Sequence, residues 1–165
     1  MKCRLAADLQ SDSILDGEGI RTVIWFQGCL HNCPGCHNPE THDLNGGKAY
    51  DVDEIKEQIR NLKYQKGITL SGGDPFFQPE AAIEFAKCAH ETGLNVWAYT
   101  GFTYEALVSS NDKKKELLEN VDILVDGKFI LAEKSLECKF RGSTNQRIID
   151  VKKSLEEGNV VIYAK

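Results

Sequence analysis

The sequence predicts an α/β fold in which a mainly parallel sheet forms an open, incomplete (β/α) barrel. From Thr22 onward, short apolar segments alternate with amphipathic helical segments, which is the pattern of strand-helix units. The 165 residues hold about five or six such units, too few to close an eight-stranded barrel of about 250 residues. The same length predicts a single domain over residues 1–165.

The first half of the chain contains two strand-helix units. The first predicted strand covers residues 22–27 and is followed by a cysteine-rich loop. Residues 51–62 predict a helix, because their apolar side chains recur at helical spacing on one face. The second strand covers residues 67–73 and ends in a Gly-Gly turn. Pro79 suits the first turn of the next helix, which Gly93 can end.

The second half continues the alternation. Residues 94–99 predict a third strand, residues 104–118 one or two short helices, and residues 121–125 a fourth strand. Residues 147–151 and 160–163 are strand candidates on either side of a short helix. The sequence shows no linker rich in Pro, Gly or Ser and no internal repeat, which again favours one domain.

Composition narrows the class of protein. A hydrophobic fraction of 41% and a charged fraction of 27% are typical of a folded globular chain. The net charge of -5 disfavours nucleic acid as a partner. No segment approaches the ~18 apolar residues of a membrane span, and the first residues lack a signal-peptide pattern. We therefore expect a cytoplasmic protein without a membrane partner.

Polar motifs follow each of the four central strands. The cysteine loop follows the first strand, GGDP the second, YTG the third and DGK the fourth. In parallel α/β folds, ligands bind at the edge formed by the carboxyl ends of the strands. The sequence therefore predicts that these four motifs share one site.

Three of the six cysteines lie within eight residues, in a C-x3-C-x2-C pattern formed by Cys29, Cys33 and Cys36. In a reducing compartment this pattern indicates metal binding rather than disulfides. A structural zinc ion would require a fourth ligand, such as His31 or His37. A 4Fe-4S cluster on three cysteines would keep one iron open to another ligand. The loop alone leaves both possibilities open.

The pairing of C-x3-C-x2-C with SGGDP after the next strand resembles the radical S-adenosylmethionine enzymes. The resemblance extends to DGEGIR, GCLHNCPGCHNP, SGGDPF, YTGFTYEAL, ILVDGKF and FRGSTNQRIID, which together are similar to the glycyl-radical activases of anaerobic ribonucleoside-triphosphate reductases. It covers residues 16–150 with the motifs in the family order.

The resemblance implies that Cys29, Cys33 and Cys36 bind a 4Fe-4S cluster. It also implies that Gly35 and His37 line the adenine side of S-adenosyl-L-methionine, and that the methionyl amino group lies near Gly72, Gly73 and Asp74. Glycines permit close backbone approach, and a carboxylate accepts hydrogen bonds from an ammonium group. Without the cysteines, GGDP would be interpreted as a tight turn before a helix.

Further contacts follow from the remaining motifs. Thr100 and Asp126 are candidate polar contacts at the same edge, or caps of the elements that follow. Ser143 and Asn145, together with Gln146, are candidate cofactor contacts, although a polar turn explains them equally well.

Two positions depart from the pattern of related proteins. Gly35 stands where many members of the superfamily have an aromatic residue, and Glu18 stands where related activases often have proline. The second departure leaves Asp16 and Arg21 available for contact with a partner protein, or simply as part of a glycine hairpin.

The implied function is reductive cleavage of S-adenosylmethionine at the cluster and formation of a glycyl radical on anaerobic ribonucleoside-triphosphate reductase. An electron donor such as flavodoxin or a similar protein would be required. Alternatives are an activase of another glycyl-radical enzyme, such as pyruvate formate-lyase, and a small radical enzyme that acts on a free metabolite. A small zinc-stabilised interaction module is a further alternative, but it leaves SGGDP and DGK unexplained.

Overall fold

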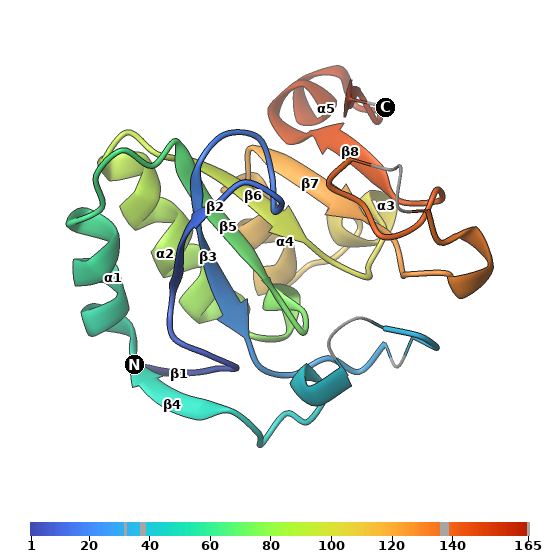
Figure 1. The fold of residues 1–165 in the computed structure, drawn as a ribbon. Coiled ribbons are helices and arrows are strands. Elements are labelled where there is room, and N and C mark those ends of the chain that lie inside the picture. The colour runs from blue at the N-terminus through green and yellow to red at the C-terminus, as the bar shows by residue number, and fades with distance from the viewer. Residues whose placement is uncertain (32, 37–38, 136–138, 165) are drawn as a thin grey trace.

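The computed structural model describes residues 1–31, 33–36, 39–135 and 139–164. Its centre is a parallel sheet of four neighbouring strands, β3 (Arg21–Phe26), β5 (Gly67–Gly72), β6 (Asn95–Tyr99) and β7 (Ile123–Asp126). Each strand pairs in parallel with the next (Figure 1). The four central strands expected from the sequence are therefore confirmed in type, order and approximate bounds.

Antiparallel strands extend both sides of this centre. On one side β8 (Arg147–Asp150) pairs with β7, and β9 (Ile162–Ala164) pairs with β8. On the other side β1 (Lys2–Leu5) pairs with β3 and β4 (Lys48–Asp51) with β1, while β2 (Gln10–Ser13) also pairs with β3. Within the described residues the sheet runs from β4 to β9 without closing on itself. The open, incomplete barrel is confirmed.

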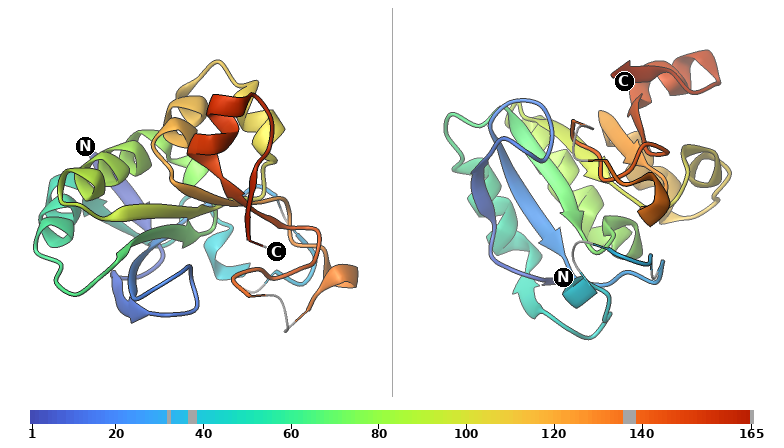
Figure 2. Two further views of the ribbon diagram at one scale, coloured as in Figure 1. Left: turned by 90° about the horizontal axis from the view of Figure 1, so that it is seen from above. Right: turned by 45° about the vertical axis from the view of Figure 1, so that its right-hand side comes forward.

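The helices lie on one side of the sheet, as the view from above shows (Figure 2). Their bounds are α1 Val52–Arg60, α2 Pro79–Glu91, α3 Tyr104–Val108, α4 Lys113–Glu119 and α5 Val151–Glu157. The expected helical segment 104–118 is split in two, because Asp112 caps a new helix by accepting a hydrogen bond from the Lys114 amide. None of the described helices is long and apolar enough to cross a membrane.

Three short 3-10 turns complete the elements in the described part of the chain: η1 Pro39–Thr41, η2 Pro75–Phe77 and η3 Leu131–Glu133. Asp74 begins η2 by accepting a hydrogen bond from the Phe76 amide. The residue therefore ends the turn after β5 and starts the next element, which fixes the direction of the chain at the carboxyl edge of the sheet.

The main hydrophobic core lies between the sheet and the helices. Alternate residues of the strands, such as Ile24 and Leu70, pack against Ile59 of α1 and Phe85 of α2. Cys88 is 1% exposed in this core. Burial of this continuous apolar layer stabilises the sheet-helix arrangement.

The opposite face of the sheet is concave and carries a smaller cluster formed by Trp97, Ile123, Val125 and Ile148. Phe140, from the loop before β8, packs edge-on against Trp97 with ring centroids 5.4 Å apart. The concave face is therefore covered by loops rather than by helices.

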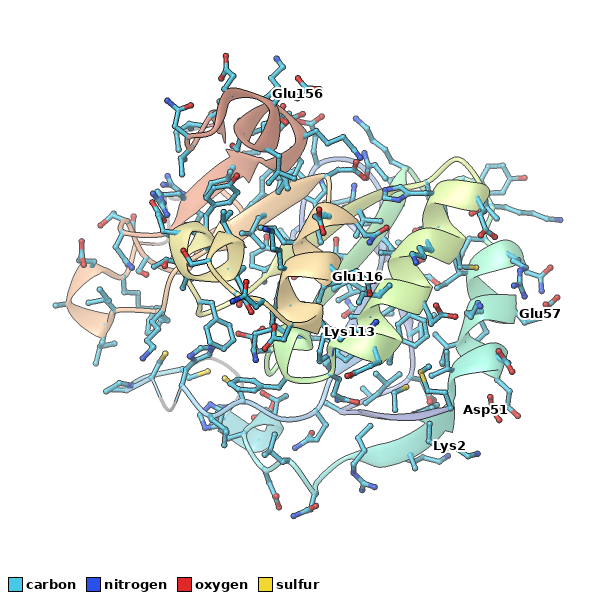
Figure 3. The ribbon with its side chains drawn as sticks, turned by 180° about the vertical axis from the view of Figure 1, so that it is seen from behind. Lys2, Asp51, Glu57, Lys113, Glu116 and Glu156 are labelled. Carbon is cyan, nitrogen blue, oxygen red and sulfur yellow. The ribbon has the colours of Figure 1, made fainter. Side chains whose placement is uncertain are left out.

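The outer helical surface is strongly charged (Figure 3). Lys113 and Glu116 form an ion pair of 3.2 Å along α4, and Lys2 and Asp51 form one of 3.7 Å between neighbouring strands. Exposed pairs of this kind contribute little to stability. The helical face is exposed to solvent. The candidate site therefore lies at the carboxyl edge of the sheet, which loops cover.

Candidate active site

The four motifs predicted to share a site meet at one edge of the sheet. The parallel register places the ends of β3, β5, β6 and β7 at the same edge, and the loops that follow β3 and β7 both lie there (Figure 1). The cysteine loop, GGDP, YTG and DGK therefore lie at one edge of the sheet, as the strand pattern predicted.

The backbone holds the start of the cysteine loop in place. The Gly28 amide donates a hydrogen bond of 2.6 Å to the Thr41 carbonyl, and the Cys29 amide donates one of 3.1 Å to the His42 carbonyl. The loop thus returns along η1 and is joined to it at its first residues. Gly35 lies further along the loop, where its positive φ of 74° suits glycine.

The three thiols of this loop are half-buried. Burial raises the pKa of Cys29 to about 11, and the negative charges of Asp74, Cys33 and Cys36 act in the same direction. Burial also raises the pKa of Cys33, against a hydrogen bond from the Phe129 backbone and the positive charge of Lys128, which lower it. The thiols therefore interact electrostatically with one another, and a bound cation would favour their ionised forms.

Among the described residues, no three His, Cys, Asp or Glu side chains lie close enough together to hold a single metal ion. A 4Fe-4S cluster is bound through one thiolate per iron, so the three cysteines need not share one metal ion.

A central cavity of about 740 Å³ lies beside the cysteine loop on the concave side of the sheet. Its lining includes Asp16, Trp25, Cys36, Gly72, Tyr99 and Arg141. A volume in this range is typical of pockets that bind small organic molecules. The presence of Cys36 in the wall means that a ligand in the cavity would lie next to the cysteine loop.

The central cavity has a cationic side. Lys134, Lys139 and Arg141 line it, and Arg141 donates a hydrogen bond of 2.9 Å to the Gln146 carbonyl. The Nε atom of Arg141 is buried and has no hydrogen-bond partner among the described residues. A buried guanidinium nitrogen without a partner favours a ligand with an anionic or carbonyl oxygen.

The GGDP turn packs directly on the start of the cysteine loop. The Gly73 amide donates to the Phe26 carbonyl at 2.8 Å, and the Asp74 amide donates to the Gly28 carbonyl at 2.9 Å. A Cβ atom at Gly72 would lie 2.3 Å from the Phe26 carbonyl oxygen, and one at Gly73 would lie 2.5 Å from that of Gly28. Both glycines are required for this packing, and Gly72 also lines the central cavity.

The Asp74 side chain is fully buried and engaged within the protein. One carboxylate oxygen accepts from the Phe76 amide at 2.9 Å. The other accepts from His31 at 2.7 Å, from the Thr100 hydroxyl at 2.8 Å and from the Gly101 amide at 2.9 Å. Asp74 and Thr100 therefore organise the loops around the cavity rather than line it.

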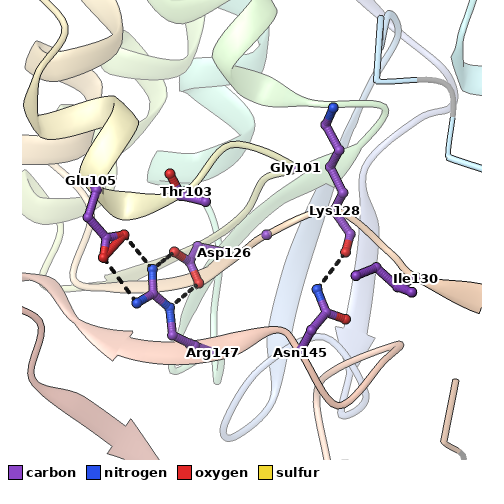
Figure 4. Close-up of a pocket in the computed structure, with 9 residues that line it drawn as sticks. Gly101, Thr103, Glu105, Asp126, Lys128, Ile130, Asn145 and Arg147 are labelled. Carbon is purple, nitrogen blue, oxygen red and sulfur yellow. Dashed lines mark hydrogen bonds and ion pairs between the residues drawn. The ribbon is translucent and has the colours of Figure 1, made fainter. Parts of the chain in front are cut away.

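A second, side pocket of about 590 Å³ contains Asp126 and Asn145 (Figure 4). Arg147 forms a two-pronged ion pair with buried Asp126 and a further contact of 2.6 Å with Glu105. Asp126 also accepts from the Tyr104 amide at 2.8 Å, at the start of α3, so it contacts an earlier helix and does not cap the element that follows it. Asn145 donates to the Lys128 carbonyl at 2.9 Å. Both expected cofactor contacts thus lie beside the central cavity, in a pocket of their own.

Ser143 belongs to a polar turn. It is fully buried, donates to the Asn145 side chain at 2.6 Å and accepts from the Ile130 amide at 3.2 Å. The Gln146 side chain accepts from the Ser143 amide and lines the central cavity. The turn interpretation explains Ser143, whereas Gln146 is placed where a ligand could contact it.

The expected availability of Arg21 for contact with a partner protein is wrong, because the side chain is not at the surface. Arg21 is fully buried at the start of β3, which is the opposite end of that strand from the cysteine loop. Its guanidinium donates to the Thr69 hydroxyl at 2.8 Å and to the Ile68 carbonyl at 2.7 Å, and lies 5.6 Å from the centre of the Trp97 ring. The polar interior of the concave face accommodates the cation, which the sequence motif did not reveal.

The remaining candidates from the DGEGIR motif and the cysteine loop are Asp16, Gly35 and His37. Asp16 is half-buried, accepts a hydrogen bond of 2.6 Å from Ser13 and lines the central cavity. Gly35 packs on Leu131, since a Cβ atom there would lie 2.8 Å from that side chain. His37 lies outside the described residues.

Sequence reasoning missed several residues of the site. Trp25, Tyr99 and Arg141 line the central cavity, and His31 contacts Asp74. For Trp25 and Tyr99 the signal was available, because alternation along a strand places them opposite the core residues. The contact of His31 with a residue 43 positions away left no local signal.

Comparisons with known proteins show the family of the chain. The family model described as "4Fe-4S single cluster domain" matches residues 15–149. The chain is 35% identical over 143 residues to an anaerobic ribonucleoside-triphosphate reductase-activating protein of Enterobacteria phage T4, covering 81% of this chain and 86% of that protein. It is 32% identical over 142 residues to the protein of that name in Escherichia coli K12, covering 81% and 90%.

A solved structure shares the fold. The crystal structure of QueE from Escherichia coli matches with a TM-score of 0.51 and 15% identity, over 62% of this chain and 54% of the QueE chain. At that identity the match concerns the fold alone. The relatives at higher identity and the family model decide the classification: the chain contains a 4Fe-4S single cluster domain and belongs to the family of anaerobic ribonucleoside-triphosphate reductase-activating proteins.

Proposed function

We propose that the protein binds a 4Fe-4S cluster through Cys29, Cys33 and Cys36 and uses S-adenosylmethionine to form a glycyl radical on an anaerobic ribonucleoside-triphosphate reductase. The name shared by its relatives supports this partner. The observation that carries the proposal is the meeting of the cysteine loop, Gly72 and the central cavity at one edge of an open sheet.

The donor set fits the cluster. Three thiols from one loop satisfy three irons and leave a fourth iron for another ligand. A structural zinc site would require a fourth protein ligand. The family model described as "4Fe-4S single cluster domain" favours the cluster over zinc.

The central cavity fits S-adenosylmethionine. Trp25 and Phe129 provide apolar and aromatic surface, and the unpartnered Nε of Arg141 suits a carboxylate. Gly72 brings backbone to the wall beside Cys36, where an amino group could approach closely. When both groups are bound, the reduced cluster supplies an electron that cleaves S-adenosylmethionine and yields a species able to take a hydrogen atom from glycine.

The chain itself forms the walls of the reaction site. The sheet and the loop before β8 line the cavity, and Asp16 lies in its wall as a candidate contact for the partner. Because the sheet is not closed, a segment of a second protein has a route to the cavity. A protein of the flavodoxin class is our proposed electron donor.

Metal analysis is the first test. Protein purified without oxygen should contain about four iron and four sulfide per chain. Zinc at about one per chain without sulfide would instead support the zinc-stabilised interaction module.

Activity is the second test. The reconstituted protein is reduced without oxygen and mixed with S-adenosylmethionine, with and without the reductase. We expect 5'-deoxyadenosine together with a glycyl-radical signal in electron paramagnetic resonance when the reductase is present. Pyruvate formate-lyase in place of the reductase is the matched control. A radical on that enzyme alone would contradict the proposed partner, and deoxyadenosine with no protein radical would favour a free metabolite.

A further inference from the structure

One side chain of the cysteine loop points into the protein. His31 lies between Cys29 and Cys33, and its side chain is only 7% exposed. The neighbouring Leu30 is 64% exposed. The proposed cluster and cofactor contacts do not use His31, although it lies only two residues from Cys29 and two residues from Cys33.

His31 joins the loop to a fixed point of the sheet edge. Its Nε2 atom lies 2.7 Å from Asp74, and because a carboxylate only accepts, the imidazole is the donor. The carboxylate is itself held by the Phe76 amide after β5 and by Thr100 and Gly101 after β6. His31 therefore connects the cysteine loop to the ends of two neighbouring strands.

The imidazole also occupies a close-fitting slot. Its ring centroid lies 5.3 Å from that of Phe77 and 4.7 Å from that of Phe102, with the second pair edge-on. The backbone of Gly101 forms the floor, because a Cβ atom there would lie 2.4 Å from the His31 ring. The hydrogen bond to Asp74 requires a donor at this position, and the close contacts require a side chain of the size and shape of imidazole.

We propose that His31 is a positioning residue that clasps the cysteine loop to the sheet edge, so that Cys29 and Cys33 are held ready for the cluster. The proposal rests on the proposed function only in taking this loop as the cluster site. A fixed point between two of the thiols reduces the conformational entropy that the loop loses when a cluster binds.

The first experiment compares His31→Ala with His31→Gln. The cluster-free full-length chain is treated with iodoacetamide, and the alkylation rate of each cysteine is followed by peptide mass spectrometry. We expect Cys29 and Cys33 to react roughly three- to tenfold faster in His31→Ala, because loss of a hydrogen bond eases local opening. After reconstitution, the same variant should retain less iron and sulfide. The Gln variant should recover part of both effects, because its amide can donate to Asp74.

The matched control is His90→Ala. His90 forms a similar pair with Asp122 at 2.8 Å, and Asp122 also accepts a backbone amide hydrogen bond, from Val96. This pair lies outside the cysteine loop and the central cavity. Its removal should leave thiol protection and iron content at wild-type values.

A second experiment displaces the His31 imidazole without substituting Asp74, His31 or a cysteine. In Gly101→Ala the new methyl group would overlap the imidazole, so alkylation should accelerate as in His31→Ala. In the double variant His31→Ala/Gly101→Ala the overlap is absent. The second substitution should then add little to the first.

The proposal is overturned if His31→Ala keeps wild-type thiol protection and iron content. It is also overturned if His31→Gln loses as much thiol protection and iron as His31→Ala does. The third contradicting outcome is that Gly101→Ala accelerates alkylation equally in the presence and absence of the His31 side chain. Thermal unfolding of the cluster-free chains identifies any variant that fails to fold. The role of His31 is then judged from the variants that do fold. Because thiol protection is measured without the cluster, it can support the clasp even if metal analysis rejects the proposed function.

Discussion

At the scale of single residues, the three clustered cysteines are distinguished from the buried ones by their environment. Cys29, Cys33 and Cys36 are half-buried on one loop, whereas Cys88 is 1% exposed in the main core. We predict that replacing any loop cysteine with alanine abolishes cluster binding and cleavage of S-adenosylmethionine. Cys88→Ala should retain about four iron per chain, with some loss of stability. Iron and sulfide analysis checks both, and loss of the cluster in Cys88→Ala would contradict the ligand assignment.

A second prediction concerns Gly73. Its Cβ position would fall 2.5 Å from the Gly28 carbonyl oxygen, at the entrance to the cysteine loop. Gly73→Ala should therefore lower cluster content as well as affinity for S-adenosylmethionine, because the two loops can no longer pack closely. Iron analysis together with an equilibrium titration separates the two effects. Wild-type cluster content with weakened cofactor affinity would show that Gly73 acts on the cofactor alone.

The residue scale also shows what sequence reasoning can reach. The cysteines were predictable because their spacing within one loop already defines a metal donor set. Asp74 was predictable as part of the site, but its burial beneath His31 and Thr100 was not, since these partners come from two other loops. Arg21 was misplaced because a charged residue usually indicates surface, and only the tertiary structure supplies its carbonyl acceptors.

At the scale of elements, the central strands and the main helices followed from apolar periodicity, whereas the N-terminal strands did not. β1 and β2 are four residues long, and β2 consists entirely of polar residues. Such strands form because a neighbouring edge pairs with them, and a local pattern does not contain that edge. The parallel centre was predictable, and so were β8 and β9 as strands, whereas β1, β2, β4 and the antiparallel direction of the borders required the structure.

Burial of Cys3 in β1 leads to a pH prediction. Burial raises the pKa of its thiol from 9.0 to about 11, and the charge of Asp51 acts in the same direction. Above pH 9 the unfolded chain releases this proton while the folded chain retains it. The free energy of unfolding should therefore fall between about pH 9 and pH 11. Urea unfolding across this range should show a shallower fall for Cys3→Ala, and equal slopes would contradict the assignment.

β8 is attached to the parallel centre by a charged contact. Arg147 pairs with Asp126, which is 1% exposed, and with Glu105 of α3. Arg147→Ala would leave the Asp126 charge buried without its partner, so we predict a loss of about 3 kcal/mol in the free energy of unfolding. Lys113→Ala, which removes only an exposed pair on α4, is the control and should cost at most about 0.5 kcal/mol. Equal, small effects in urea unfolding would show that β8 is held by its backbone pairing and apolar contacts.

At the scale of the whole molecule, the open sheet relates the fold to a protein substrate. A central cavity of about 740 Å³ lies at the edge where the strands of an unclosed sheet end. Exposed apolar side chains lie at this cavity, with Ile14 at 66% and Leu15 at 78% exposure. A free chain therefore leaves the reaction site accessible to water, and only a second molecule can complete its enclosure.

The last prediction follows from this incomplete enclosure. A protein segment seated over the cavity excludes water and places its glycine beside the cofactor, and such positioning can contribute several kcal/mol to lowering a barrier. We predict that formation of 5'-deoxyadenosine accelerates with reductase concentration and saturates, and that Asp16→Lys shifts the half-saturating concentration upward because Asp16 lines the cavity. A reductase whose target glycine is replaced by alanine should still accelerate cleavage without yielding a protein radical, which separates docking from hydrogen transfer. A cleavage rate that does not depend on either form of the reductase would show that the cavity is already competent in the free chain.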